Sequence, residues 1–205
     1  CCIPFSYTAG SSLLAVYYRQ LIAKIMTSYR RFKMNDLFKF NSVNLDKLTE
    51  TYNMGFYCHY MATWPEYFVT AESRDGSIQG YVMGKAEGQD KLWHGHVTAV
   101  TVAPTYRRLG LAKSLMNYLE NISQDVYNCY FVDLFVRASN SLAIGMYTKF
   151  GYVKYRRVLG YYCGTTCMED DYEDAWDMRK ALPRDVHKET VVPLKHPIRP
   201  QDLEW

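Results

Sequence analysis

The sequence has no long uninterrupted apolar run and little bias of charge. Its N-terminal apolar segment, residues 12–25, contains Arg19 and Lys24 and is too short to span a bilayer. The formal net charge is only +3 over 205 residues, and the basic residues stand in pairs such as Arg30 and Arg31. Nucleic-acid-binding proteins normally carry a stronger basic stripe. We therefore expect neither a membrane association through a span nor a direct nucleic-acid site.

The cysteine pattern lacks the spacing of a disulfide-stapled or zinc-binding protein. Six cysteines are scattered through segments that already carry a core-forming pattern, which suits reduced thiols. Cys163 and Cys167 are spaced C-x-x-x-C, but a structural zinc needs four ligands and only His187 and His196 lie downstream. We expect a cytoplasmic protein that holds no metal.

Two common phosphate-binding loops are also missing. A Walker loop requires Gly-Lys-Ser/Thr, and a dinucleotide loop requires G-x-G-x-x-G. The sequence has neither, which argues against a P-loop nucleotide hydrolase and against a Rossmann-type oxidoreductase.

What is present is enough apolar sequence for one core. Apolar residues make up 48% of the chain and charged residues 22%, which is ordinary for a globular domain. The chain begins with Cys, and a different pattern opens at Met26. We expect residues 1–25 to lie outside the domain, with a short amphipathic helix on a membrane or partner as the alternative. The domain is expected over residues 26–182, and residues 183–205 form a polar, proline-containing tail that is ordered only if it docks.

Periodicity and turn residues predict alternating helices and strands. Helices are expected over residues 35–43, 55–64, 109–122 and 139–150, and strands over 67–71, 78–84, 94–103, 129–136, 152–159 and 175–178. Asp75 and Gly76 form the turn of a hairpin. The order predicts an α/β domain with a mixed sheet flanked by helices.

The most informative motif is a single-glycine loop, Arg107-Arg108-Leu109-Gly110-Leu111-Ala112, between a predicted strand and an amphipathic helix. A helix start offers free N–H groups and a partial positive charge, which together bind phosphate. Gly110 lets the backbone approach a ligand, and the two arginines add charge-assisted contacts. A bare helix start with solvated arginines is the alternative interpretation.

A second motif follows: Asn140-x-x-Ala143-x-x-x-Tyr147-x-x-Phe150-Gly151-Tyr152. Together the two motifs resemble the GCN5-related N-acetyltransferase (GNAT) superfamily. The resemblance implies a mixed, mostly antiparallel twisted sheet and the use of acetyl-CoA. It also implies cofactor contacts from the strand before the loop, the loop itself, the asparagine and the tyrosine: Val100, Thr101, Val102, Arg107, Arg108, Leu109, Gly110, Leu111, Ala112, Asn140 and Tyr147.

Further segments are similar to the catalytic subunits of the N-terminal acetyltransferase complex NatB. They include residues 45–52, 64–68, 84–88, 93–99, 131–137, 161–162, 177–182 and 196–200. The resemblance implies acetylation of the α-amine of nascent chains that begin Met-Asp, Met-Glu, Met-Asn or Met-Gln. It also implies a heterodimer with a large helical-repeat auxiliary subunit, working on the ribosome.

The resemblance and the residue chemistry suggest roles for individual side chains. Tyr147 is expected to protonate the leaving thiolate after direct attack by the amine, while backbone N–H groups near Val100 stabilise the oxyanion. His96 is expected near the chemistry, and with Thr98 it would hydrogen-bond the second substrate residue. The remaining peptide contacts are expected from Glu50, Tyr52, Tyr161 and Tyr162. His96 as a structural histidine, Glu50 as a cap or ion-pair partner and each tyrosine as packing remain open alternatives.

Two other functions fit the same fold. One is a lysine ε-amine acetyltransferase, which would need a firmer base because a lysine amine has a pKa near 10.4. The other is a non-catalytic acyl-CoA-binding scaffold subunit, against which the intact Gly110, Asn140 and Tyr147 argue.

Overall fold

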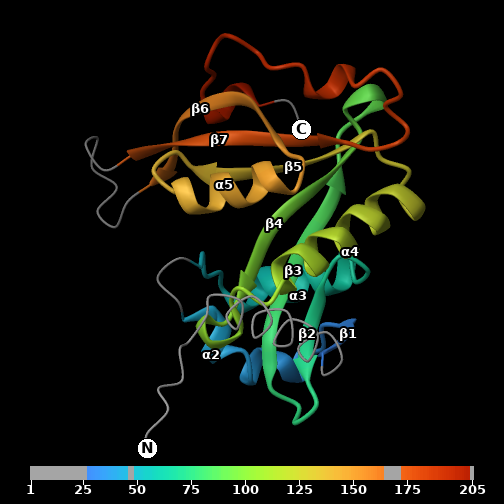
Figure 1. Cartoon of the computed structure of the whole chain (residues 1–205), viewed down its shortest axis with the longest axis vertical. Coiled ribbons are helices and arrows are strands. Elements are labelled where there is room, and N and C mark those ends of the chain that lie inside the picture. The colour runs from blue at the N-terminus through green and yellow to red at the C-terminus, as the bar shows by residue number, and fades with distance from the viewer. Residues whose placement is uncertain (1–26, 46–48, 164–171, 204–205) are drawn as a thin grey trace, which may run out of the picture.

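A seven-stranded sheet organises the molecule (Figure 1). The computed structural model describes residues 27–45, 49–163 and 172–203. The strand order is β1-β2-β3-β4-β5-β7-β6. The strands are β1 (Thr27–Arg31), β2 (Val69–Ser73), β3 (Ile78–Glu87), β4 (His94–Val102), β5 (Phe131–Arg137), β6 (Val153–Cys163) and β7 (Tyr172–Ala181). The α-helices within these ranges are α2 (Asn41–Asn44), α3 (Met54–Thr63), α4 (Leu111–Asp125) and α5 (Ser141–Lys149).

The predicted fold class is confirmed, with differences at particular elements. The hairpin forms β2 and β3, and the helices after the loop and after Asn140 form α4 and α5. Residues 35–43 are two short pieces, a 3-10 helix at Met34–Phe38 and then α2, because the backbone leaves helical geometry at Lys39 (φ −118°, ψ −11°). Strand β1 was not predicted. Residues 1–25 and Cys167 lie outside the described residues.

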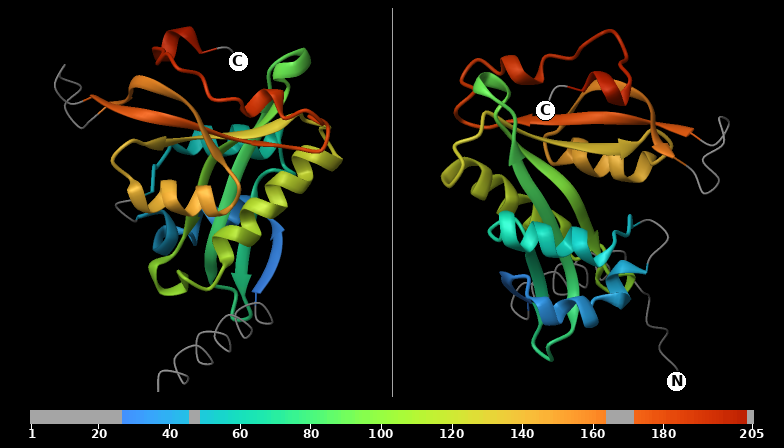
Figure 2. Two further views of the ribbon diagram at one scale, coloured as in Figure 1. Left: turned by 45° about the horizontal axis from the view of Figure 1, so that its top comes forward. Right: turned by 180° about the vertical axis from the view of Figure 1, so that it is seen from behind.

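The helices cover the two faces of the sheet. Figures 1 and 2 show α4 against one face and α3 against the other. Helix α4 is amphipathic, and Leu111, Leu115 and Leu119 on its buried stripe pack into the larger core cluster. The smaller cluster beneath α3 is aromatic, with Tyr57 and Tyr81 fully buried. Truncating one of the buried leucines to alanine would destabilise the fold by about 2–5 kcal/mol.

The sheet opens between its two parallel strands. Strands β4 and β5 pair only from His94 to Val97, opposite Phe131 to Leu134. Beyond this stretch β5 continues alongside β7, so the two parallel strands diverge. Thr98 is the extra residue of a bulge against β3, because Met83 pairs with Ala99 while Gly84 pairs with Val97. The remainder of β4 therefore has no neighbour on its β5 side among the described strands.

The segment after β7 docks along the outer strand. The N–H groups of Leu194 and Ile198 donate to the carbonyls of Tyr155 and Arg157, and Leu159 N–H donates to the Ile198 carbonyl. Leu203 is buried against β6 and β7. This contact covers the exposed edge of β6, which would otherwise offer unpaired backbone groups.

No helix in the described ranges is both long enough and apolar enough to cross a membrane.

Candidate active site

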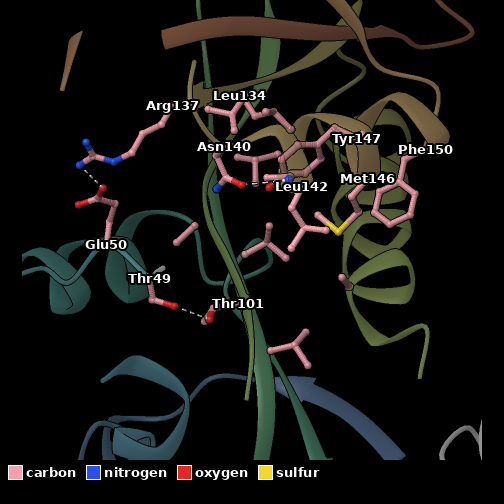
Figure 3. A pocket seen from close by; sticks show the side chains of 18 of the residues that line it. Thr49, Glu50, Thr101, Leu134, Arg137, Asn140, Leu142, Met146, Tyr147 and Phe150 are labelled. Atoms are coloured by element: carbon pink, nitrogen blue, oxygen red, sulfur yellow. Dashed lines mark hydrogen bonds and ion pairs between the residues drawn. The ribbon is translucent and has the colours of Figure 1, made fainter. Parts of the chain in front are cut away.

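A groove of about 900 Å³ occupies the opening between β4 and β5. The end of β4 and the start of α4 border it on one side, and α5 borders it on the opposite side (Figure 3). The loop at residues 49–52 and the tyrosines of β6 line the remainder. The groove therefore lies at the point where the sheet stops pairing.

The start of α4 is built to receive an anion. Gly110 precedes the helix in a left-handed conformation (φ 88°, ψ 0°), and no side chain caps the helix there. The first-turn N–H groups, which have no partner within a helix, are thus left to an outside acceptor. A Cβ on Gly110 would meet no protein atom within 4 Å, so the space beside its backbone is open. Arg108 also has a positive φ of 66°.

The predicted loop residues divide into those that line the groove and one that does not. Arg107, Arg108, Gly110, Leu111 and Ala112 line it. The Nε of Arg107 donates to the carbonyl of Val102 at 3.0 Å, which ties the loop to the end of β4.

Leu109 does not line the groove and instead packs against the larger core cluster. Its predicted place among the cofactor contacts stays a prediction. An apolar side chain in this loop is better used as an anchor than as a phosphate contact.

The end of β4 supplies a polar backbone edge. Val100, Thr101 and Val102, which were predicted to contact the cofactor, line the groove. Thr101 shares a hydrogen bond of 2.7 Å with Thr49 across the groove (Figure 3). Because no described strand pairs with this side of β4, its N–H and C=O groups can bind an extended, amide-containing ligand as a strand would.

Asn140 and Tyr147 face the groove from α5. Asn140 is the N-cap of the helix, and its Oδ1 accepts from the Ala143 N–H at 3.0 Å. Tyr147 is 8% exposed, and burial raises the pKa of its phenol well above the ordinary value. A tyrosine in this state stays protonated and can act as a hydrogen-bond donor or acid. Both side chains also line the groove, as predicted.

The other end of the groove is aromatic and polar. The Tyr52 hydroxyl donates to the Thr98 carbonyl at 3.3 Å, and Tyr60 shares a hydrogen bond of 2.9 Å with the Thr98 hydroxyl. The bulge at Thr98 thus brings both of its polar groups to these tyrosines. Tyr161 and Tyr162 line the same end. Burial raises the pKa of Tyr161 to about 12.

An ion pair spans the groove at this end. Glu50 accepts from Arg137 at 2.9 Å (Figure 3). Arg137 also contacts Glu173 at 3.2 Å and lies 4.3 Å over the Tyr162 ring. Glu50 was predicted as a substrate contact, with an ion pair as the alternative, and the structure shows that ion pair. Arg137 was missed.

His96 does not line the groove, although it was predicted as a catalytic and substrate-binding residue. Its side chain is 9% exposed, and its Nδ1 lies 2.8 Å from Oδ1 of Asp133. The next residues along β4, Val97 and Thr98, do line the groove, so His96 directly precedes the part of β4 that lines it.

Sequence reasoning overlooked three charged or polar residues. Asp133 and Arg137 lie in an otherwise apolar strand, and a buried charge such as Asp133 is rare without partners. That contrast was the signal that could have found them. Tyr60 carried no signal beyond its aromatic neighbours.

The groove fits acetyl-CoA. An uncapped helix start and two arginines suit its phosphates, and an unpaired strand edge suits the amides of its pantetheine arm. The volume of about 900 Å³ lies in the range of small-molecule sites.

The chain matches the same family in three comparisons: with a family model, with protein sequences and with solved structures. Residues 31–152 match the family model described as the acetyltransferase (GNAT) family. The chain is 61% identical over 180 residues to the N-terminal acetyltransferase B complex catalytic subunit NAA20 of Arabidopsis thaliana, covering 88% of this chain and 99% of that protein.

Two solved structures are similar over most of their length. One is Chaetomium thermophilum Naa20 in complex with a bisubstrate analogue, with 43% identity and a TM-score of 0.78 over 85% of this chain and 97% of that one. The other is the NatB acetyltransferase complex bound to CoA and MES, with 47% identity and a TM-score of 0.67 over 76% of this chain and 99% of that one.

Proposed function

Because the chain belongs to the GNAT family and, within it, to the catalytic subunits of the N-terminal acetyltransferase B complex, it is an acetyl-CoA-dependent N-terminal acetyltransferase; we propose that its substrates are chains beginning Met-Asp, Met-Glu, Met-Asn or Met-Gln. The observation that carries the proposal is that one groove joins two different walls. One wall binds anions at the start of α4, and the other is formed by Glu50, Tyr52, Thr98 and the β6 tyrosines.

The first wall holds the coenzyme. The N–H groups at the start of α4, with Arg107 and Arg108 beside them, would hold the phosphates, and the edge of β4 would pair with the pantetheine amides. Acetyl-CoA supplies a thioester whose carbonyl is open to attack by an amine. The N–H groups near Val100 would stabilise negative charge that develops on that carbonyl oxygen.

The peptide amine needs little activation. A protein α-amine has an ordinary pKa of about 7.7–8.0, so a useful fraction is neutral at cellular pH. Holding the amine against the carbonyl supplies much of the acceleration. Tyr147, kept protonated by burial, would give its proton to the leaving sulfur.

An acyl-enzyme is not required. Cys129 is a free thiol that lies 1% exposed and does not line the groove. Burial raises the pKa of this thiol to about 11, so the nucleophilic thiolate is scarce. We therefore propose direct transfer from coenzyme to amine.

The second wall favours a polar residue at substrate position two. Thr98 and the tyrosines around it present hydroxyl and carbonyl groups, which an apolar substrate side chain would leave unpaired. This supports the preference for acidic and amide side chains.

We further propose that the chain works in the cytoplasm, on nascent chains at the ribosome, with a large helical-repeat auxiliary subunit. Its membership among NatB catalytic subunits supports this assembly.

A peptide screen tests the proposal. Peptides of the form Met-X are acetylated with the full chain in the presence and absence of a co-purified partner, and products are read by mass spectrometry. Met-Asp, Met-Glu, Met-Asn and Met-Gln peptides are expected to react. The same peptides with a blocked terminus and a free lysine are not. Acetylation of the lysine alone would overturn the proposal.

A further inference from the structure

Thr98, the extra residue of the β4 bulge, is held by two tyrosines from different elements. The Tyr60 hydroxyl of α3 lies 2.9 Å from the Thr98 hydroxyl, and the Tyr52 hydroxyl donates to the Thr98 carbonyl at 3.3 Å. Thr98 is half-buried and lines the groove, whereas Tyr60 is 4% exposed and does not line it. Thr98 therefore lies between Tyr60 and the groove.

Burial decides which of the two hydroxyls donates in the Tyr60–Thr98 hydrogen bond. A buried donor without an acceptor costs free energy, whereas a hydroxyl beside the groove can give its hydrogen to water or to a ligand. Among the described residues, Thr98 Oγ1 is the one hydrogen-bond partner of the Tyr60 hydroxyl. Burial also raises the pKa of Tyr60, so the phenol keeps its proton. Tyr60 is therefore the donor, and Thr98 accepts.

This direction leaves the hydrogen of the Thr98 hydroxyl for a partner on the groove side. A threonine hydroxyl carries one hydrogen, and Tyr60 occupies a lone pair of Thr98 Oγ1 instead of that hydrogen. The Thr98 carbonyl is already bonded to Tyr52. Thr98 thus presents a hydrogen-bond donor to the groove. Aspartate, glutamate, asparagine and glutamine side chains all carry an oxygen that can accept from it, and a leucine or lysine side chain carries none.

We propose that Tyr60 is a positioning residue for substrate selection: by donating to Thr98 Oγ1, it turns the hydrogen of the Thr98 hydroxyl toward the side chain at substrate position two. This inference rests on the proposed function, since it assigns a determinant to the same peptide end of the groove. Tyr60 acts through Thr98 and does not itself touch substrate. Acidic and amide side chains are then accepted through the feature they share, an acceptor oxygen.

Packing holds the Tyr60 ring in place before any substrate binds. The ring belongs to the aromatic cluster beneath α3, where its centroid lies 4.8 Å from that of Phe56 and 5.3 Å from that of Trp64. A ring packed on two sides has little rotamer freedom left to lose when its hydroxyl donates. The orientation of the Thr98 hydroxyl is therefore set in advance, which lowers the ordering cost of binding the peptide.

The test removes the donor and keeps the ring. Tyr60→Phe is compared with the unmodified protein by steady-state kinetics on a Met-Asp peptide, using the full chain with its co-expressed partner. KM for the peptide should rise by about fivefold, because the Thr98 hydrogen is no longer directed. kcat and KM for acetyl-CoA should stay within about twofold, since the contact is made equally in the bound substrate and the transition state. If Thr98 instead donated to Tyr60, the variant would free the Thr98 hydrogen and lower the peptide KM, which would overturn the proposal.

Tyr67 offers a matched control. Its hydroxyl also lies 2.9 Å from another hydroxyl, that of Ser123, and its side chain is buried outside the groove lining. Tyr67→Phe therefore removes the same kind of hydrogen bond and should lower the melting temperature by a similar amount, with both KM values unchanged. An equal rise in peptide KM for Tyr67→Phe and Tyr60→Phe would show that lost stability causes the effect, and the proposal would fall.

Variants of Thr98 show whether Tyr60 acts through its hydroxyl. Thr98→Val should raise the peptide KM by about tenfold, and adding Tyr60→Phe should change it no further. Thr98→Ser keeps the hydroxyl and should stay within about threefold of the unmodified protein. Multiplied effects in the double variant would overturn the proposal. Equal losses in Thr98→Val and Thr98→Ser would do the same, even if thermal melts show Tyr60→Phe to be unfolded. If the unmodified protein acetylates no Met-Asp peptide, the proposed function itself fails.

Discussion

At the residue scale, Gly110 combines a conformational requirement with an open surface. Its φ of 88° is strained for a residue with a Cβ, while the position of that Cβ meets no protein atom. We predict that Gly110→Ala weakens acetyl-CoA binding by about tenfold, because the loop must either bear a strain of about 1–2 kcal/mol or change shape. Isothermal titration with acetyl-CoA measures this.

Gly76 supplies the control for that substitution. It has a φ of 82°, also meets nothing within 4 Å, and lies in the β2–β3 turn away from the groove. Gly76→Ala should show the same loss of stability with unchanged coenzyme affinity. Equal affinities for the two variants and the unmodified protein would contradict a role of the helix start in holding phosphate.

Individual residues were predictable where their role is fixed by local backbone. The helix start at Gly110 follows from a short motif, and a second motif singled out Asn140; the structure places both along the groove, with Asn140 as the N-cap of α5. The placement of Leu109 and His96 depends on which face of an element meets the core. That depends on tertiary packing, which a motif does not encode. Their predicted roles remain predictions.

At the scale of elements, the Glu50–Arg137 ion pair joins the loop before α3 to the end of β5 across the groove. Both side chains are more than one third exposed, so the pair should contribute no more than about 1 kcal/mol to stability. We predict that Arg137→Gln raises KM for peptide by several-fold and leaves KM for acetyl-CoA unchanged, because the coenzyme wall is formed by other elements. Steady-state kinetics with each substrate varied in turn measures this.

A double-mutant cycle with Glu50→Gln separates the pair from its members. If the ion pair orients Glu50, the two substitutions together should cost little more than either alone. Arg157→Gln serves as the control, since Arg157 pairs with Asp174 at 2.7 Å outside the groove lining. Additive effects of Glu50→Gln and Arg137→Gln would show that the two residues act separately.

Long elements with a clear period were predictable, and short or bulged ones were not. Helix α4 shows its stripe at Leu111, Leu115 and Leu119 in the sequence itself. Strand β6 runs beyond the predicted end at residue 159 because Gly160, with a φ of 62°, accommodates a shift in register with β7. The divergence of β4 from β5 is also invisible to periodicity, since the side-chain pattern of a strand does not say where its pairing with a neighbour stops.

At the scale of the whole molecule, burial of tyrosine couples stability to alkaline pH. Burial raises the pKa of Tyr67, Tyr81, Tyr152 and Tyr161 above the ordinary value of about 10. A raised pKa means that the folded state keeps protons which the unfolded state releases. The stabilisation is complete below pH 10 and is lost as pH rises through the folded-state values.

We therefore predict that the contribution of these tyrosines to the free energy of unfolding does not change with pH up to about pH 10. Above about pH 10 the free energy of unfolding should fall steeply. Urea titrations at a series of pH values measure this, and the near-ultraviolet absorbance of phenolate reports ionisation in parallel. Tyrosine ionisation that proceeds fully below the unfolding transition would contradict the burial of these phenols.

The gap left where β4 and β5 stop pairing has a consequence for turnover. The contacts it offers are to phosphates and pantetheine amides, which are identical before and after the acetyl group leaves. Such contacts bind CoA about as tightly as acetyl-CoA, since the contacted groups are the same in both molecules. The enzyme should therefore be sensitive to the ratio of CoA to acetyl-CoA around it. Modification of new chains would slow as that ratio rises, without any separate regulatory site.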